Sequence, residues 1–106
     1  MNNYTLVKTA LVNKKQITAY YKGYYREMCP HIIGLKRGKI HGLFYQFGGE
    51  SSSGNIVGGS PDNWRCIEID KLENISLRNG SWHEAPLDRD QTCIDQVDIS
   101  IDELED

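Results

Sequence analysis

The stretch Gly48–Arg65, GGESSSGNIVGGSPDNWR, is the segment around which the rest of the chain is organised. It holds five of the ten glycines and a run of three serines. It separates two apolar segments with strand-like composition, Ile40–Phe47 and Trp64–Ile69. Clusters of Gly, Ser, Asn and Pro between such segments are typical of loops. Since loops of about 15 residues in small domains are usually functional, we expect this one to form the rim of a groove.

Before the loop, the N-terminal segment has the pattern of a short amphipathic helix. Its apolar residues recur at helical spacing, at Leu6, Val7, Ala10 and Leu11. Asn3 stands where a side chain can cap the first turn. We predict a helix over residues 4–14, which must pack on the rest of the fold because a helix this short is marginal alone.

The remaining apolar pattern is that of short strands joined by turns. We predict five strands, at Gln16–Tyr21, Tyr24–Cys29, Ile40–Phe47, Trp64–Ile69 and Leu72–Leu77. Lys22-Gly23 and Lys36-Arg37-Gly38-Lys39 are tight-turn signals. Pro30 is expected to close the second strand because it cannot donate to a ladder, and Ile32-Ile33-Gly34-Leu35 is the candidate continuation of that strand after a bend. The fold class is therefore mainly β (α+β), a short N-terminal helix followed by a five-stranded antiparallel SH3/Sm-like bent sheet or barrel.

Charge divides the chain into two parts. Residues 1–87 carry a net charge of +4 and are expected to form one domain, whereas residues 88–106 carry −7. Within this acidic tail, Gln96–Ile101 alternates apolar and acidic residues, which predicts an edge strand before the chain frays. The tail is either simply solvated, or it lies over a basic face and competes with an anionic ligand.

Several classes of protein are disfavoured by the composition. The chain has no apolar run of the roughly 18–20 residues that cross a bilayer. Its three cysteines, Cys29, Cys66 and Cys93, form no close pair. We therefore expect no disulfide, no metal site and no cofactor, and a cytoplasmic location. No nucleophile stands beside a base in a strand–turn–helix context, so we expect no enzyme.

Two arginines are the strongest candidates for a binding role. Arg26 and Arg65 each lie inside a predicted strand, where an arginine needs a partner or a ligand. Either each pairs with an acid such as Glu27, Glu68 or Asp70, or it binds an anion.

Aromatic and polar residues near these arginines complete the candidate site. Tyr45 and Trp64 could stack on a base. His31, at the predicted end of a strand, is either a ligand contact or a structural histidine. Ser51 and Ser53 are either plain linker or part of an anion-binding nest with the flanking glycine amides.

These residues also resemble those of a known family, the WYL domain, an Sm-like β-barrel of bacterial transcriptional regulators. The segment Arg26-Glu-Met-Cys-Pro30 is similar to the R-x-hydrophobic-x-P motif of that family, and Tyr21 falls where its first-strand tyrosine lies. Arg65-Cys-Ile-Glu-Ile-Asp70-Lys-Leu72 resembles its later R-x-F-R-L-D-R-I segment. The resemblance implies a groove that binds a nucleotide, an oligonucleotide or single-stranded nucleic acid, with Tyr21, Arg26 and Arg65 as contacts.

Our leading hypothesis is a non-enzymatic, regulatory module that binds an anionic, nucleotide-like ligand or single-stranded nucleic acid. The alternative is a protein-interaction module of phage or mobile-element type. In that case the acidic tail would bind a basic partner or mimic nucleic acid. We expect no membrane contact, and open strand edges are compatible with a monomer or a homodimer.

Overall fold

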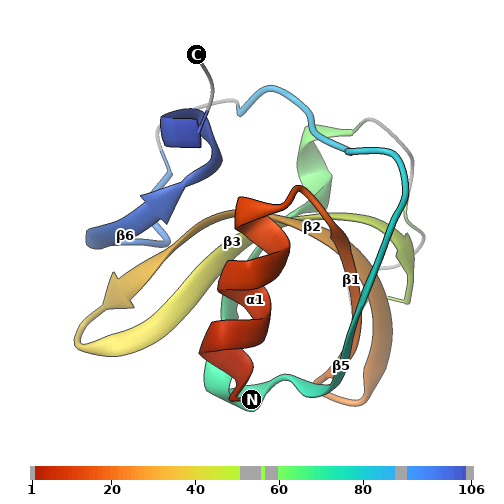
Figure 1. The fold of residues 1–106 in the computed structure, drawn as a ribbon, viewed down its shortest axis with the longest axis horizontal. Helices are drawn as coiled ribbons and strands as arrows, with labels where there is room; N and C mark the ends of the chain where they lie inside the picture. The colour runs from red at the N-terminus through yellow and green to blue at the C-terminus, as the bar shows by residue number, and fades with distance from the viewer. Residues whose placement is uncertain (1, 51–55, 57–59, 88–90, 105–106) are drawn as a thin grey trace.

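The computed structural model describes residues 2–50, 56, 60–87 and 91–104, and these form one short helix and a bent antiparallel sheet (Figure 1). The elements, in chain order, are α1 (Asn3–Val12), β1 (Gln16–Tyr21), β2 (Tyr24–Lys36), β3 (Lys39–Gly49), the 3-10 turn η1 (Pro61–Asn63), β4 (Trp64–Glu68), η2 (Ile69–Lys71), β5 (Glu73–Arg78), β6 (Gln96–Ser100) and η3 (Ile101–Leu104). The mainly β class with an N-terminal helix is confirmed.

Helix α1 is capped one residue earlier than predicted. The Asn2 side-chain oxygen accepts a hydrogen bond from the Thr5 backbone N–H at 2.8 Å, which satisfies one of the free donors of the first turn. Asn3 instead lies inside the helix and donates to the carbonyls of Ile69 and Leu72, at 3.0 and 2.8 Å. Asn3 therefore ties the helix to η2 at the far end of the sheet.

Two tight turns shape the first three strands. Lys22 and Gly23 have φ values of 52° and 81°, and Arg37 and Gly38 have 50° and 81°. Two consecutive residues with positive φ are the signature of the type I′ hairpin turn, whose twist matches that of the strands. Both turns were predicted from their Gly-containing sequences.

Strand β2 runs through Pro30, which was expected to close it, and includes the candidate continuation Ile32–Leu35. The register between β2 and β3 shifts between Pro30 and Ile32, so the proline occupies an irregularity where the missing N–H is tolerated. The first half of β2 pairs with β1, and residues 32–35 pair with β6. The proline thus marks the place where β2 exchanges one neighbour for another.

The strands follow the order β4-β3-β2-β1-β5, with β6 added beside β2 and all pairs antiparallel. In the part of the chain described, the outer strands β4 and β5 do not pair with each other, so the sheet bends without closing into a barrel. Gly34 permits the addition of β6, since a Cβ at this position would lie 2.1 Å from the Gln96 carbonyl oxygen.

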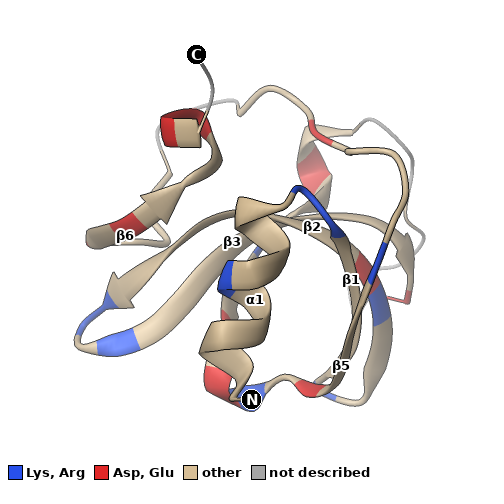
Figure 2. Ribbon diagram, viewed as in Figure 1, with Lys and Arg blue, Asp and Glu red and all other residues tan. Residues whose placement is uncertain are grey.

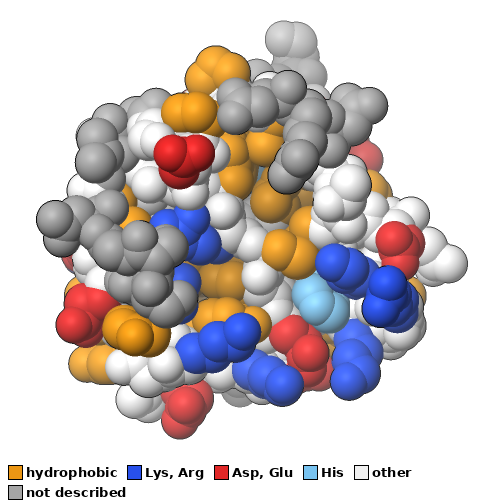
Figure 3. Space-filling view, turned by 180° about the vertical axis from the view of Figure 1, so that it is seen from behind, with side chains coloured by type: hydrophobic (Ala, Val, Ile, Leu, Met, Phe, Trp, Pro, Cys, Tyr) orange, Lys and Arg blue, Asp and Glu red, His pale blue; other side chains and the backbone are white. Residues whose placement is uncertain are grey.

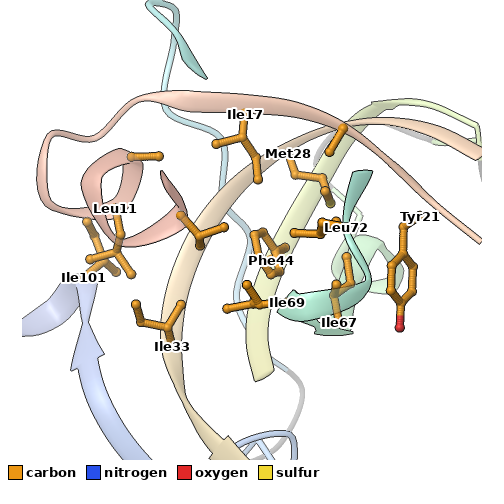
Figure 4. Close-up of a cluster of buried hydrophobic side chains, with 13 residues drawn as sticks. Leu11, Ile17, Tyr21, Met28, Ile33, Phe44, Ile67, Ile69, Leu72 and Ile101 are labelled. Atoms are coloured by element: carbon orange, nitrogen blue, oxygen red, sulfur yellow. The ribbon is translucent and has the colours of Figure 1, made fainter. Parts of the chain in front are cut away.

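The core fills the concave side of this bent sheet, between the strands and α1 (Figure 4). Phe44 of β3 lies among buried aliphatic side chains from β1, β2, β4, α1, η2 and η3. Tyr21 lies at the margin of the same cluster and is 8% exposed.

The C-terminal segment is folded against the body rather than forming a free tail between residues 91 and 104. The expected edge strand is present as β6, and Ile101 of η3 is buried in the core. The acidic residues of this segment lie around β6 and η3 (Figure 2). These positions do not cover Arg26, which lies in the other half of β2.

The expectation that the cysteines form no disulfide was wrong. Cys66 on β4 and Cys93 are disulfide-bonded, with Cα atoms 5.6 Å apart and a sequence separation of 27. The bond joins β4 to the segment that leads into β6. Cys29 is a free, buried cysteine. In the described ranges no helix is both long and apolar enough to span a bilayer.

Candidate anion-binding site

Four polar side chains extend the core face of the sheet toward its open end. Strand alternation places every second residue on the same face. Arg26 therefore shares a face with the core residue Met28, and Tyr21 is itself part of the core cluster. By the same rule Gln46 follows Phe44 on β3, and Arg65 precedes Ile67 on β4. The predicted residues Tyr21, Arg26 and Arg65 are thus brought to one face.

Arg26 is the most unusual of these residues. Its side chain is 4% exposed and its guanidinium lies 5.3 Å from the ring of Tyr21 and 5.8 Å from the ring of Tyr24. Within the described residues it makes one side-chain hydrogen bond, from Nη1 to Gln46 Oε1 at 3.1 Å. Its Nε–H is buried without an acceptor among the same residues. A guanidinium has five N–H donors, so much of its capacity is unused.

Gln46 holds both the arginine and the start of the Gly/Ser loop. Its side chain is fully buried, and its amide nitrogen donates to the carbonyls of Gly48 and Glu50, at 3.0 and 2.8 Å. The amide oxygen of Gln46 is the acceptor for the hydrogen bond from Arg26, since the amide nitrogen can only donate. The backbone N–H of Glu50 in turn bonds to the Tyr25 carbonyl at 2.6 Å. The sequence prediction missed Gln46, although alternation from Phe44 already placed it beside Arg26.

Electrostatics set Arg26 apart from an ordinary structural arginine. Burial lowers its pKa, and the positive charge of Arg65 lowers it further. The rings of Tyr21 and Tyr24 oppose this shift. Burial also lowers the pKa of Arg65, which donates from Nη1 to the backbone carbonyls of Asp62 and Trp64. Two like charges near one another in a partly desolvated place favour an anion between them.

The alternative in which Arg26 pairs with a nearby acid is not realised. Glu27 forms its ion pair with Arg78 instead, at 2.8 Å. Among the described residues Arg26 has no ion-pair partner, and the loop between Glu50 and Ser60 contains no acidic residue in its sequence. A buried arginine without a carboxylate is costly, which is the condition that a bound anion would relieve.

Three other predicted site residues lie on the opposite, convex face. Tyr45 and Trp64 face each other across β3 and β4, with ring centroids 5.1 Å apart. His31 lies against Trp64 at 4.8 Å and against Trp82 at 5.0 Å. The indole N–H groups of both tryptophans are buried without an acceptor among the described residues. The sheet separates these rings from the arginines, so the interpretation that they stack on the arginine-bound ligand was wrong.

The segment after β5 crosses this convex face and accounts for its packing. His83 stacks on Phe47 with centroids 4.1 Å apart, and its carbonyl contacts His31 Nε2 at 3.1 Å. Its backbone N–H approaches the Cys29 sulfur at 3.4 Å. Burial raises the pKa of the Cys29 thiol to about 11, so it is protonated at neutral pH.

The two remaining predicted residues, Ser51 and Ser53, lie outside the described residues. Within those residues, no group of three or more His, Cys, Asp and Glu side chains could hold a metal ion.

The fold and this site define a small α+β protein whose bent antiparallel sheet carries a buried arginine on its core face. Comparison with family models, with curated proteins and with solved structures finds no match to this chain. The similarity to WYL domains stays a prediction that rests on the motifs around Arg26 and Arg65.

Proposed function

We propose that this protein is a non-enzymatic binding module that takes an anionic, nucleotide-like ligand or single-stranded nucleic acid at Arg26 and Arg65. The observation that carries the proposal is the buried guanidinium of Arg26, which has one side-chain hydrogen bond and an unpartnered Nε–H among the described residues. Desolvation of this charge is not offset by a carboxylate there, and ionisable groups perturbed in this way cluster at functional sites.

The surroundings support a phosphate more than a metal or a neutral group. A guanidinium offers two parallel N–H donors that match phosphate and carboxylate oxygens. Arg65 adds a second positive charge close enough to alter the pKa of Arg26. Figure 3 shows Lys and Arg side chains interspersed with Asp and Glu on the face turned away from α1, so the attraction for an anion at this site comes from Arg26 and Arg65 themselves.

The tyrosines of this face supply the aromatic surface that a nucleotide requires. Tyr21 and Tyr24 already lie against the guanidinium of Arg26. A base next to a bound phosphate would contact these rings, rather than Tyr45 or Trp64. The proposed regulatory role follows from the similarity to WYL domains, in which ligand binding has a regulatory output.

The direct test is a titration with a mononucleotide panel and a fluorescein-labelled oligothymidylate at two salt concentrations. We expect Arg26→Met to weaken binding about 10- to 100-fold, the loss expected for hydrogen bonds to a charged group. Arg78→Met is the matched control, because Arg78 is a surface arginine paired with Glu27. Equal binding by the wild-type protein and Arg26→Met would falsify the proposal.

The salt dependence distinguishes the two ligand classes. A single-stranded nucleic acid that neutralises Z charges loses affinity with a slope of about −0.7Z against log salt concentration. A mononucleotide held by two arginines should give a shallower slope than the oligonucleotide. Binding of the oligonucleotide alone, with a steep slope, would indicate the nucleic-acid class.

A further inference from the structure

A second pocket lies on the convex face, on the other side of the sheet from Arg26. It has a volume of about 220 Å³. His31 and Trp64 form its wall on the sheet, and Leu87 lies at its margin. Glu84, from the segment that crosses this face, and Asp102 of η3 also line it. Chain segments distant in sequence thus bring two carboxylates and two aromatic rings to one hollow.

The charge of this pocket is negative. Both carboxylates act on His31, whose pKa is lowered by burial and raised in part by Glu84 and Asp102. Among the described residues that line the pocket, none is Lys or Arg. Within the described residues, neither carboxylate forms an ion pair.

Other acids of the C-terminal segment are already engaged, which sets these two apart. Asp98 bonds to Tyr4 and forms an ion pair with Lys8 at 3.4 Å. Asp95 accepts from the backbone N–H of Arg37 at 2.9 Å. Glu84 and Asp102, in contrast, line the pocket and are not held by such a bond among the described residues.

The size and the aromatic wall narrow the class of ligand. Sites for drug-sized molecules usually exceed about 300 Å³, so this pocket suits a group the size of one side chain. Tryptophan is the aromatic residue that attracts cations most strongly. A cation with a short apolar stem would meet the carboxylates with its charge, and Leu87 and Trp64 with its stem.

We propose that this pocket binds an alkylammonium group, either of a free amine or of a lysine side chain on a partner protein. The site is independent of the arginine site, because the sheet lies between them. A lysine in this pocket would also give the acidic C-terminal segment a basic partner.

The test uses n-butylammonium as the probe and n-butanol as its neutral counterpart, with the full-length protein. Tryptophan fluorescence reports on the site, since Trp64 and Trp82 both contact His31. Amide chemical shifts of residues 84–87 and 100–102 in ¹H–¹⁵N spectra locate the binding. We expect a saturable response to n-butylammonium that n-butanol does not produce and that weakens at high salt.

Neutralising the carboxylates should weaken binding of n-butylammonium. For Glu84→Gln with Asp102→Asn we expect about a five- to tenfold loss, as for two partly exposed ion pairs. The matched control is Asp70→Asn with Glu73→Gln, which removes the same charge from exposed positions elsewhere. Arg26→Met should leave this binding unchanged.

Three results would overturn the proposal. They are no saturable response to millimolar n-butylammonium, an equal response to n-butanol, and equal losses in the two double variants. A lysine-containing peptide and its norleucine counterpart then separate the two sources of the ammonium group. Tighter binding of the lysine peptide than of n-butylammonium indicates a protein partner, and equal or weaker binding indicates a free amine.

Discussion

Neighbouring residues on each strand of this sheet point to opposite faces, one concave and one convex. On β3, Tyr45 faces outward and Gln46 inward, and on β4 Trp64 faces outward and Arg65 inward. The outward rings pack on one another and on the segment after β5, and the Tyr45 hydroxyl donates to the Ser60 carbonyl at 2.9 Å. The inward Arg26 has a buried N–H donor without an acceptor among the described residues. The outward aromatic residues therefore stabilise the fold by packing, whereas the inward arginine has a donor that a ligand could use.

The largest expected effect tests whether the convex aromatic face is structural. Tyr45 is 1% exposed, so Tyr45→Ala should lower the free energy of unfolding by about 3–5 kcal/mol. Tyr45→Phe, which loses only the hydroxyl bond, should cost about 1 kcal/mol. Chemical denaturation measures both. Anion affinity should survive in Tyr45→Phe, and a loss of affinity there would mean that the two faces are not separate.

The disulfide on the convex side gives the next effect. Replacing Cys66 and Cys93 by serine should cost about 3.5 kcal/mol, the loop-closure value for a separation of 27 residues. Thiol titration gives an independent measurement. The native protein should show no reactive thiol, and the unfolded, unreduced protein should show one, that of Cys29. Three thiols without reductant would contradict the assignment of the disulfide.

On the concave face, Arg26→Met should leave the free energy of unfolding unchanged or raise it, and should lower the affinity for an anion. Removing an unpaired buried charge is expected to leave stability unchanged or to raise it, by about 1–4 kcal/mol in favourable cases. The same change should weaken anion binding about 10- to 100-fold. Thermal unfolding with and without ligand measures both quantities. A strongly destabilised variant would show that Arg26 is a structural residue.

The smallest effect is a pH dependence that originates on the convex face. Burial lowers the pKa of His31 in the folded state, so protonation favours the unfolded state. Its contribution to stability is present above the ordinary histidine pKa of about 6.5 and is lost as the pH falls through the lower folded value. The slope is at most about 1.4 kcal/mol per pH unit.

Denaturation between pH 5 and 8 measures this slope. His31→Gln should flatten the curve, and His41→Gln, on a partly exposed position of β3, should leave it unchanged. An equally steep curve in His31→Gln would assign the dependence to other groups.

Local chemistry made much of the fold predictable. Neighbouring residues are enough to predict the alternation in Gln16–Tyr21. They also predict the positive-φ turns at Lys22-Gly23 and Arg37-Gly38. Pro30 misled because a proline at a register shift has the same sequence signal as one at a strand end.

The candidate site was predictable only in part, since it depends on which residues meet across strands. The grouping of Arg26 with Arg65 was implied only by the resemblance to WYL domains, whereas Gln46 and the Cys66–Cys93 pair depend on three-dimensional proximity. Trp64 and Arg65 could not share one ligand, because consecutive strand residues point to opposite faces.

The late position of β6 in the chain has a consequence for synthesis. Residues 32–35 of β2 lack their second neighbour until Gln96–Ser100 has been made. A growing chain therefore carries an open, apolar strand edge for most of its synthesis, and such edges pair readily with other chains. Fragments that stop before residue 96 should aggregate, whereas chains that include Gln96–Ser100 cover this edge themselves.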